Sequence, residues 1–351
     1  MGIKDLLRLL GEEIQAPDEE HFDLFAQQLP SGNLGFIDPK AKTLELTVAG
    51  RDLTIHQSPA VLASSRAGGT TGAVVWKITP LFAEWISSPT NPLFTQEILT
   101  SQSCVIELGC GIAGIVGLLL APRVSTYVLT DQIYVAKLLE ENITENTQSS
   151  SSSASKPHNP KQRIAKSSKS SLAASKTGGG GGGGQIRFTT LDWETDEATP
   201  SLITSSTVLF PPGPSSSATQ TSTPKRAFDA VLACDCIYNY ALVEPFVSTC
   251  VDLCRLKQRS SSANRQRQSG DDESAEKEAE NPCICVVGQQ LREPSVFEEF
   301  LKAFAEEFHV WRIPDLASNS GFVVHLGVLK GSVRPELLEE LKALTGSRNG
   351  V

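Results

Sequence analysis

The stretch that most constrains the fold is CVIELGCGIAG, residues 104–114, in which a mostly apolar run leads straight into three closely spaced glycines. A short apolar run that ends at a turn is typical of a strand buried on both faces. Glycine lets the backbone of such a turn adopt positive φ and approach a ligand closely. The segment therefore predicts a helix-covered parallel sheet with a binding turn at the carboxyl end of one strand.

The glycine turn alone does not identify the ligand. Its G-x-G-x-x-G spacing, with Asp131 twenty residues after Gly111, also fits the fingerprint of nicotinamide enzymes. Glu107 fits that fingerprint less well, because an acid inside the strand would repel a pyrophosphate and favour a cationic group. Asp131 does not separate the two alternatives, since a carboxylate at that place accepts ribose hydroxyls in either case.

Composition limits the class of protein. The 351 residues are 40% hydrophobic, which is enough for a sizeable core, and the net charge of −9 argues against a general nucleic-acid binder. The start, MGIKDLLRLLGEE, lacks the pattern of a signal peptide, and the longest apolar run is too short to span a bilayer. We therefore expect a soluble, cytoplasmic protein without membrane contact, and we expect a monomer.

Three segments of low complexity interrupt the globular pattern, at 147–184, 199–225 and 258–281. Such composition cannot bury enough apolar surface to fold, which predicts disordered insertions. The basic part of the first segment, residues 156–176, is compatible with contact to RNA. With the insertions set aside, the chain reads as an extension over 1–60, a helix and a β-hairpin, followed by one domain over 61–346.

Eight cysteines lie mostly in apolar runs, as reduced core thiols do. The pairs Cys234/Cys236 and Cys283/Cys285 leave a zinc site open, but their spacing is not the C-x-x-C of a zinc knuckle. We expect no metal.

Strands and helices alternate through the rest of the chain, and two final strands follow each other without a helix between them. This order predicts five parallel strands with right-handed crossovers and a terminal antiparallel strand. The chain resembles the class I, S-adenosylmethionine-dependent protein lysine methyltransferases, and within them the fungal ribosomal lysine N-methyltransferase 5 group. The motifs that carry the resemblance are TTGAVVWKIT (70–79), VIELGCGIAG (105–114), VLTD (128–131), LDW (191–193) and LACDCIYN (232–239).

The resemblance implies an α/β fold with the Rossmann-like seven-stranded methyltransferase sheet, and S-adenosyl-L-methionine as cofactor. It implies that Glu107 lies near the methionine amino group, Asp131 at the ribose, Trp193 and Cys234 at the adenine, and Trp76 over the cofactor. The cofactor-binding residues expected from it are Trp76, Glu107, Gly109, Cys110, Gly111, Asp131, Trp193 and Cys234.

The resemblance further implies that Asp235 and Tyr238, the D-x-x-Y of the family, face the substrate lysine as catalytic residues. The alternative for Asp235 is a cap on the following helix. The expected partner is a protein, a large-subunit ribosomal protein such as the stalk component. A methyltransferase for RNA or small molecules, a nicotinamide oxidoreductase and a non-catalytic interaction module remain as alternatives.

Overall fold

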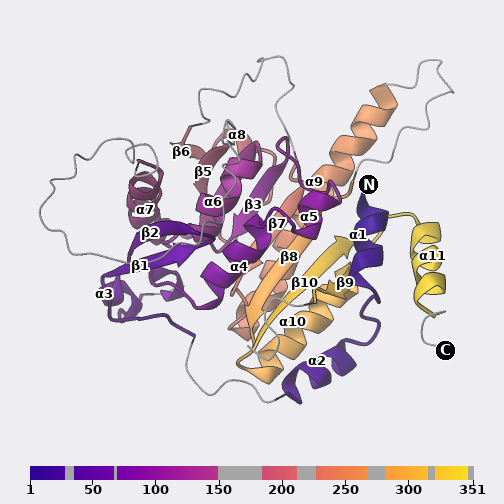
Figure 1. The fold of residues 1–351 in the computed structure, drawn as a ribbon, viewed down its shortest axis with the longest axis horizontal. Coiled ribbons are helices and arrows are strands. Elements are labelled where there is room, and N and C mark those ends of the chain that lie inside the picture. Colours follow the sequence, from indigo (N-terminus) through magenta and orange to yellow (C-terminus); the bar gives the residue numbers. More distant parts are fainter. Residues whose placement is uncertain are drawn as a thin grey trace, which may run out of the picture.

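The computed structural model describes residues 1–27, 35–66, 69–148, 184–211, 227–267, 281–314 and 321–346. An eight-stranded sheet lies at the centre, in the order β6-β5-β4-β3-β7-β8-β10-β9 (Figure 1). Its parallel strands are β3 (Cys104–Leu108), β4 (Thr126–Asp131), β5 (Gln185–Thr190), β7 (Ala230–Cys234) and β8 (Ile284–Gln290). β10 (Phe322–Leu329) runs antiparallel to β8 and to β9 (Phe308–Arg312). The predicted mostly parallel α/β sheet with an antiparallel strand near its end is confirmed.

Helices cover both faces of the sheet because neighbouring side chains on a strand point to opposite sides. On β3, Val105 lies in the core under α4, α6 and α7, whereas Ile106 lies in the core under α9 and α10. The α-helices are α1 (Ile3–Leu10), α2 (Pro17–Phe25), α3 (Pro59–Leu62), α4 (Ile78–Ser87), α5 (Pro92–Thr95), α6 (Ile115–Leu120), α7 (Ala136–Gln148), α8 (Ser201–Thr204), α9 (Tyr240–Arg267), α10 (Pro294–Glu307) and α11 (Pro335–Gly346). Single 3-10 turns are η1 (Thr71–Ala73), η2 (Ala121–Arg123) and η3 (Ile133–Val135).

The N-terminal segment contains the predicted hairpin, β1 (Thr43–Val48) and β2 (Arg51–His56), joined by Ala49 and Gly50 at positive φ. The single helix predicted for the start of the extension is instead two helices, because Pro17 begins a new one at its first position. α2 lies beside α10 at the edge of the molecule (Figure 1). There Phe25 contacts Phe297 with ring centroids 5.8 Å apart.

Two asparagines of α7 dock the hairpin onto the domain. Asn142 accepts from the His56 backbone N–H at 2.8 Å and donates to the His56 carbonyl at 3.0 Å. Asn146 makes the same pair of hydrogen bonds to Thr54, at 2.9 and 2.8 Å. These amides complete the edge of β2 as a further strand would.

The insertions are shorter than predicted. Within 199–225, α8 and β6 (Thr207–Phe210) are ordered, because Leu209 and Phe210 pack against the core and β6 adds an eighth strand beside β5. Within 258–281, α9 continues as far as Arg267, through a run rich in residues that favour helices. α7 includes 147 and 148, and residues 149–183, with the basic stretch 156–176, lie outside the described residues. In the part of the chain that is described, no helix is long and apolar enough to cross a membrane.

Candidate functional site

A cavity of about 310 Å³ opens at the carboxyl ends of β3, β4 and β7. Because β4 and β7 flank β3 on opposite sides, this is the place where an open α/β sheet binds its ligand. The ten residues predicted from sequence all line it: Trp76, Glu107, Gly109, Cys110, Gly111, Asp131, Trp193, Cys234, Asp235 and Tyr238.

The glycine turn after β3 leaves no room for side chains. Gly109 and Gly111 have φ of 66° and 61°, which other residues rarely adopt. A Cβ on Gly109 would lie 2.8 Å from Cys236 Sγ, and one on Gly111 would lie 3.1 Å from the Gly72 carbonyl oxygen. The Gly111 N–H donates to Asp131 Oδ2 at 2.8 Å, which joins the turn to the end of β4.

Two acids lie on the cavity wall, Glu107, which is buried, and Asp131, which is half-buried. Tyr127 Oη donates to Glu107 Oε2 at 2.7 Å, and only 3% of Glu107 is exposed. Burial raises the pKa of Glu107 to about 7; the Tyr127 hydrogen bond opposes this rise and the charge of Asp131 adds to it. Burial also raises the pKa of Asp131 to about 6, against the hydrogen bonds from the Gly111 and Gln132 N–H groups. Both acids would be stabilised in ionised form by a ligand that brings positive charge or hydroxyl donors.

Two tryptophans border the same space. Trp193 contacts Phe246 edge to face, with ring centroids 5.2 Å apart. Its Nε1 is buried and has no hydrogen-bond partner among the described residues, a rare condition that a bound acceptor would relieve. Trp76 donates from Nε1 to the Thr71 carbonyl at 3.1 Å, and its ring centroid lies 4.4 Å from that of Phe36. Both rings are therefore held in place from outside the cavity.

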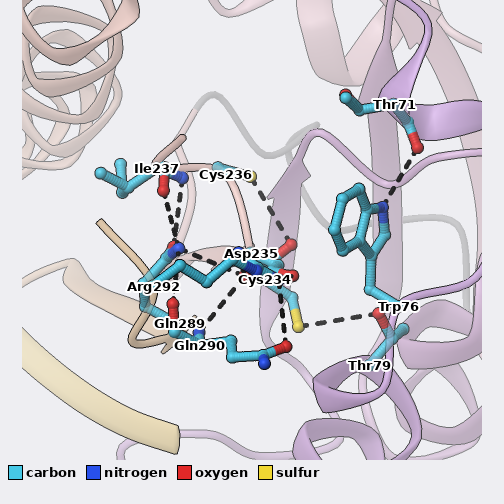
Figure 2. Close-up of polar contacts among 10 residues, drawn as sticks. All are labelled: Thr71, Trp76, Thr79, Cys234, Asp235, Cys236, Ile237, Gln289, Gln290 and Arg292. Carbon is cyan, nitrogen blue, oxygen red and sulfur yellow. Dashed lines mark hydrogen bonds and ion pairs between the residues drawn. The ribbon is translucent and has the colours of Figure 1, made fainter. Parts of the chain in front are cut away.

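The turn after β7 places Asp235 at the cavity wall with a left-handed backbone, φ 64°. Its carboxylate is held in a ring of donors from the end of β8 and the loop beyond it, as Figure 2 shows. Oδ1 accepts from Gln289 Nε2 and the Gln290 N–H, each at 3.2 Å, and from Arg292 Nη1 at 2.9 Å. Oδ2 accepts from Arg292 Nη2. The alternative of a helix cap is wrong, since the carboxylate bonds to none of the first N–H groups of α9, and Asn239 accepts from the Ala241 N–H instead.

Sequence reasoning missed Arg292 and Gln289. Gln289 is 2% exposed and bonds through both ends of its amide to the backbone of Ile237, which fixes the turn that carries Asp235 and Tyr238. Neither residue belongs to a motif of the predicted family pattern. The one available signal was the appearance of polar residues, Gln289, Gln290 and Arg292, at the end of an apolar strand, which marks the same sheet edge as the other site residues.

Residues 56–169 match the sequence model of a family described as Lysine methyltransferase. The matched range holds the glycine turn, Glu107, Asp131 and the Trp76 segment, all of which line the cavity. This part of the chain is similar in sequence to a lysine methyltransferase domain. The predicted resemblance to the class I lysine methyltransferases is thereby confirmed, and S-adenosylmethionine, not a nicotinamide, is the cofactor of the domain.

Relatives of the domain differ in how much of the chain they cover. "Ribosomal lysine N-methyltransferase 5" of Zygosaccharomyces rouxii is 28% identical over 272 residues, 74% of this chain and 72% of that protein. "Diaminohydroxyphosphoribosylamino-pyrimidine deaminase" of Schizosaccharomyces pombe is 33% identical over 133 residues, 38% of this chain; the chain spans about a third (32%) of its length. A Pyrococcus abyssi tRNA (uracil-54, C5)-methyltransferase in complex with S-adenosylhomocysteine is 11% identical, with a TM-score of 0.33, over 82% of this chain and 44% of that one.

The residues of the domain fit S-adenosylmethionine. The glycine turn leaves backbone exposed to a ligand, and within the described part of the chain no ion pair of Glu107 or Asp131 offsets the rise of their pKa values on burial. Trp193 lines the same cavity, and its Nε1 is buried without a hydrogen-bond partner among the described residues. A ligand with an ammonium group, a ribose and a heteroaromatic base matches this donor and acceptor set.

Proposed function

We propose that the domain transfers a methyl group from S-adenosylmethionine to a lysine of a large-subunit ribosomal protein. The convergence of ten residues from five separate motifs on one cavity supports the proposal most directly. The names of the fungal relatives support a ribosomal acceptor. We assign the reaction to the cytoplasm and to a monomer; light scattering of the purified protein tests the monomer.

For the cofactor, we assign Glu107 to the methionine ammonium and Asp131 to the ribose hydroxyls. Each Asp131 oxygen accepts one backbone N–H, from Gly111 or Gln132, which leaves lone pairs on both oxygens for the ribose. Trp193 and Cys234 would border the adenine and Trp76 would cover the cofactor. The backbone of residues 109–111, which includes Cys110, would run beside it.

For the acceptor, we assign Asp235 and Tyr238 to the lysine. The bound cofactor supplies a methyl group on a sulfonium, which needs a neutral amine as nucleophile, whereas free lysine is mostly protonated at neutral pH. Burial raises the pKa of Tyr238, so its hydroxyl stays protonated and can hydrogen-bond the amine. Asp235 Oδ2 accepts a single hydrogen bond, from Arg292, and keeps a lone pair that can orient an amine N–H.

Labelling tests the proposed reaction. Purified protein is incubated with tritiated S-adenosylmethionine and large ribosomal subunits from Saccharomyces cerevisiae that lack their own ribosomal lysine N-methyltransferase 5. We expect ribonuclease-resistant label that hydrolysis recovers as methyl-lysine. Gly109→Arg is the inactive control, because even a Cβ at Gly109 would lie 2.8 Å from Cys236 Sγ. Label confined to RNA would instead support the alternative of an RNA methyltransferase.

A further inference from the structure

Arg292 joins the two sides of the cavity wall. Its guanidinium forms a two-pronged ion pair with the carboxylate of Asp235, and its Cζ lies 4.8 Å from the ring centroid of Trp76. It stands just behind the wall, because Asp235 and Trp76 line the cavity and Arg292 does not. Gly35 covers it from the N-terminal segment, where a Cβ would lie 2.6 Å from Arg292 Nη2.

This pairing decides the charge beside the acceptor. The side chain of Asp235 is 1% exposed, and that of Arg292 is 20% exposed, so water screens the pair weakly. The other titratable groups that line the cavity are the carboxyl groups of Glu107, Asp131, Asp192 and Glu194, the thiols of Cys110, Cys234 and Cys236, and the phenols of Tyr134 and Tyr238. All of these are neutral or negative. A carboxylate without a counter-charge at Asp235 would hold the incoming lysine as an ammonium, which cannot attack a methyl group.

We propose that Arg292 is a positioning residue for methyl transfer, which neutralises Asp235 so that the lysine binds as the free amine, and which holds Asp235 and Trp76 in one arrangement. The inference rests on the proposed function, because it concerns the acceptor of that reaction. It predicts a specific pH dependence, since the reaction needs the acceptor amine deprotonated.

The charges determine the direction in which the pH profile shifts. In Arg292→Gln, the carboxylate of Asp235 loses its counter-charge, the pKa of the bound lysine rises, and the rising limb of the pH profile moves to higher pH. We expect a shift of about one pH unit, the usual size for one charge within about 4–6 Å. The rate then falls about tenfold at pH values below the limb and approaches that of the natural protein at high pH. Arg292→Lys keeps the positive charge and loses the paired guanidinium hydrogen bonds, so the rising limb of its pH–rate profile stays near that of the natural protein.

The experiment measures single-turnover methylation of the yeast large subunits from pH 6 to pH 10 with saturating cofactor. Arg123→Gln is the matched control, because Arg123 is also half-buried and lies over a ring, 3.5 Å from the Phe94 centroid, but away from the cavity. It should leave the limb in place. Calorimetry with S-adenosylhomocysteine shows whether each variant still binds cofactor.

A second pair of variants keeps the test decisive if Arg292→Gln does not fold. Asp235→Asn leaves Arg292 without its counter-charge, so the pKa of the bound lysine falls and the rising limb of the pH–rate profile should move to lower pH. The double variant, Asp235→Asn with Arg292→Gln, carries neither charge, so its rising limb should return to the position found in the natural protein. The inference would be overturned if the rising limb of the pH–rate profile lay at the same pH in Arg292→Gln and in the natural protein, or if Arg292→Lys shifted it as much as Arg292→Gln does. It would also be overturned if the limb lay at the same pH in Asp235→Asn and in the double variant. A natural protein that binds S-adenosylhomocysteine but methylates no lysine contradicts the proposed function instead.

Discussion

Glu107 is a buried acid whose chemistry changes with its ligand. Burial keeps its pKa at about 7 in the free protein, so near neutral pH it exchanges a proton readily. An ammonium beside it would favour the carboxylate, and binding would then release a proton. The residue is therefore suited to hold a cationic ligand, at a cost in stability when the site holds none.

That cost is measurable. The folded state binds the Glu107 proton more tightly than the unfolded state, so this group's contribution to stability is lost as pH rises from about 4.5 to about 7. Glu107→Gln should raise the free energy of unfolding of the free protein at pH 8 by roughly 3 kcal/mol, and leave it nearly unchanged at pH 4.5. Urea unfolding at the two pH values measures this, with the exposed Glu141→Gln as control.

The same substitution should weaken S-adenosylmethionine binding at pH 8 about tenfold or more, because the ammonium loses its counter-charge. A variant that is no more stable than the natural protein at pH 8 would show that Glu107 is not strained by burial. Unchanged affinity would remove Glu107 from the cofactor site.

Tyr238 offers a test of the acceptor side at a single atom. Tyr238→Phe deletes the hydroxyl and keeps a ring that is 40% exposed in the cavity mouth. We expect methyl transfer to fall about tenfold, the scale of one lost hydrogen bond, with unchanged cofactor affinity. Tyr240→Phe is the matched control, since Tyr240 is 53% exposed two residues later and does not line the cavity. Equal rates for both variants would take Tyr238 off the catalytic list.

At the scale of elements, α7 connects the hairpin to the binding turn. Asn142 is fully buried and bonds both to His56 of β2 and, at 2.8 Å, to the carbonyl of Ile112 just after the glycine turn. The same side chain therefore fixes the edge of the hairpin and the end of the turn that approaches the cofactor. The hairpin also shares an apolar core with the domain, through Leu44, Val48, Leu53 and Ile55.

Asn142→Ala should lower the free energy of unfolding by about 2–3 kcal/mol, because it removes three hydrogen bonds, one buried, to Ile112, and two part-buried, to His56. Cofactor affinity should fall as well, since the glycine turn loses its anchor. Urea denaturation and calorimetry measure the two effects, and Glu141→Ala, on the exposed side of α7, should show neither. A cost below about 0.5 kcal/mol would mean that the hairpin is not held by this amide.

At the scale of the whole molecule, α7 ends at Gln148, and the next described residue, Gly184, already donates to the Ala121 carbonyl at 3.1 Å. Loop-closure entropy changes slowly with loop length. Replacing 149–183 by a flexible linker of about twelve residues should therefore change the free energy of unfolding by less than about 1 kcal/mol.

Methylation of the yeast large subunits by the shortened protein distinguishes two roles for the removed segment. We expect full turnover, which would make the segment dispensable for chemistry. A shortened protein that folds and binds cofactor but does not methylate the subunits would instead make the basic stretch 156–176 a docking element for the substrate.

The sequence by itself determined the features that short-range physics controls. An apolar strand before three glycines, and the alternation of strands with helices, predict a parallel sheet with a binding turn. Once the sheet is parallel, the motifs at the carboxyl ends of its strands must meet at one edge. For that reason the residues predicted from Glu107 to Tyr238 line one cavity, whereas Trp76, which precedes α4, reaches the same cavity only through the tertiary fold.

Only the tertiary structure decided the features that depend on contacts distant in sequence. Asp235 meets Arg292 57 residues later, and Asn142 meets His56 86 residues earlier. Composition predicted disorder around residues 207–210, yet this segment forms β6 because the open edge of β5 offers it hydrogen bonds. No local pattern encodes these pairings, since each one forms only when the rest of the sheet has brought its partner into place.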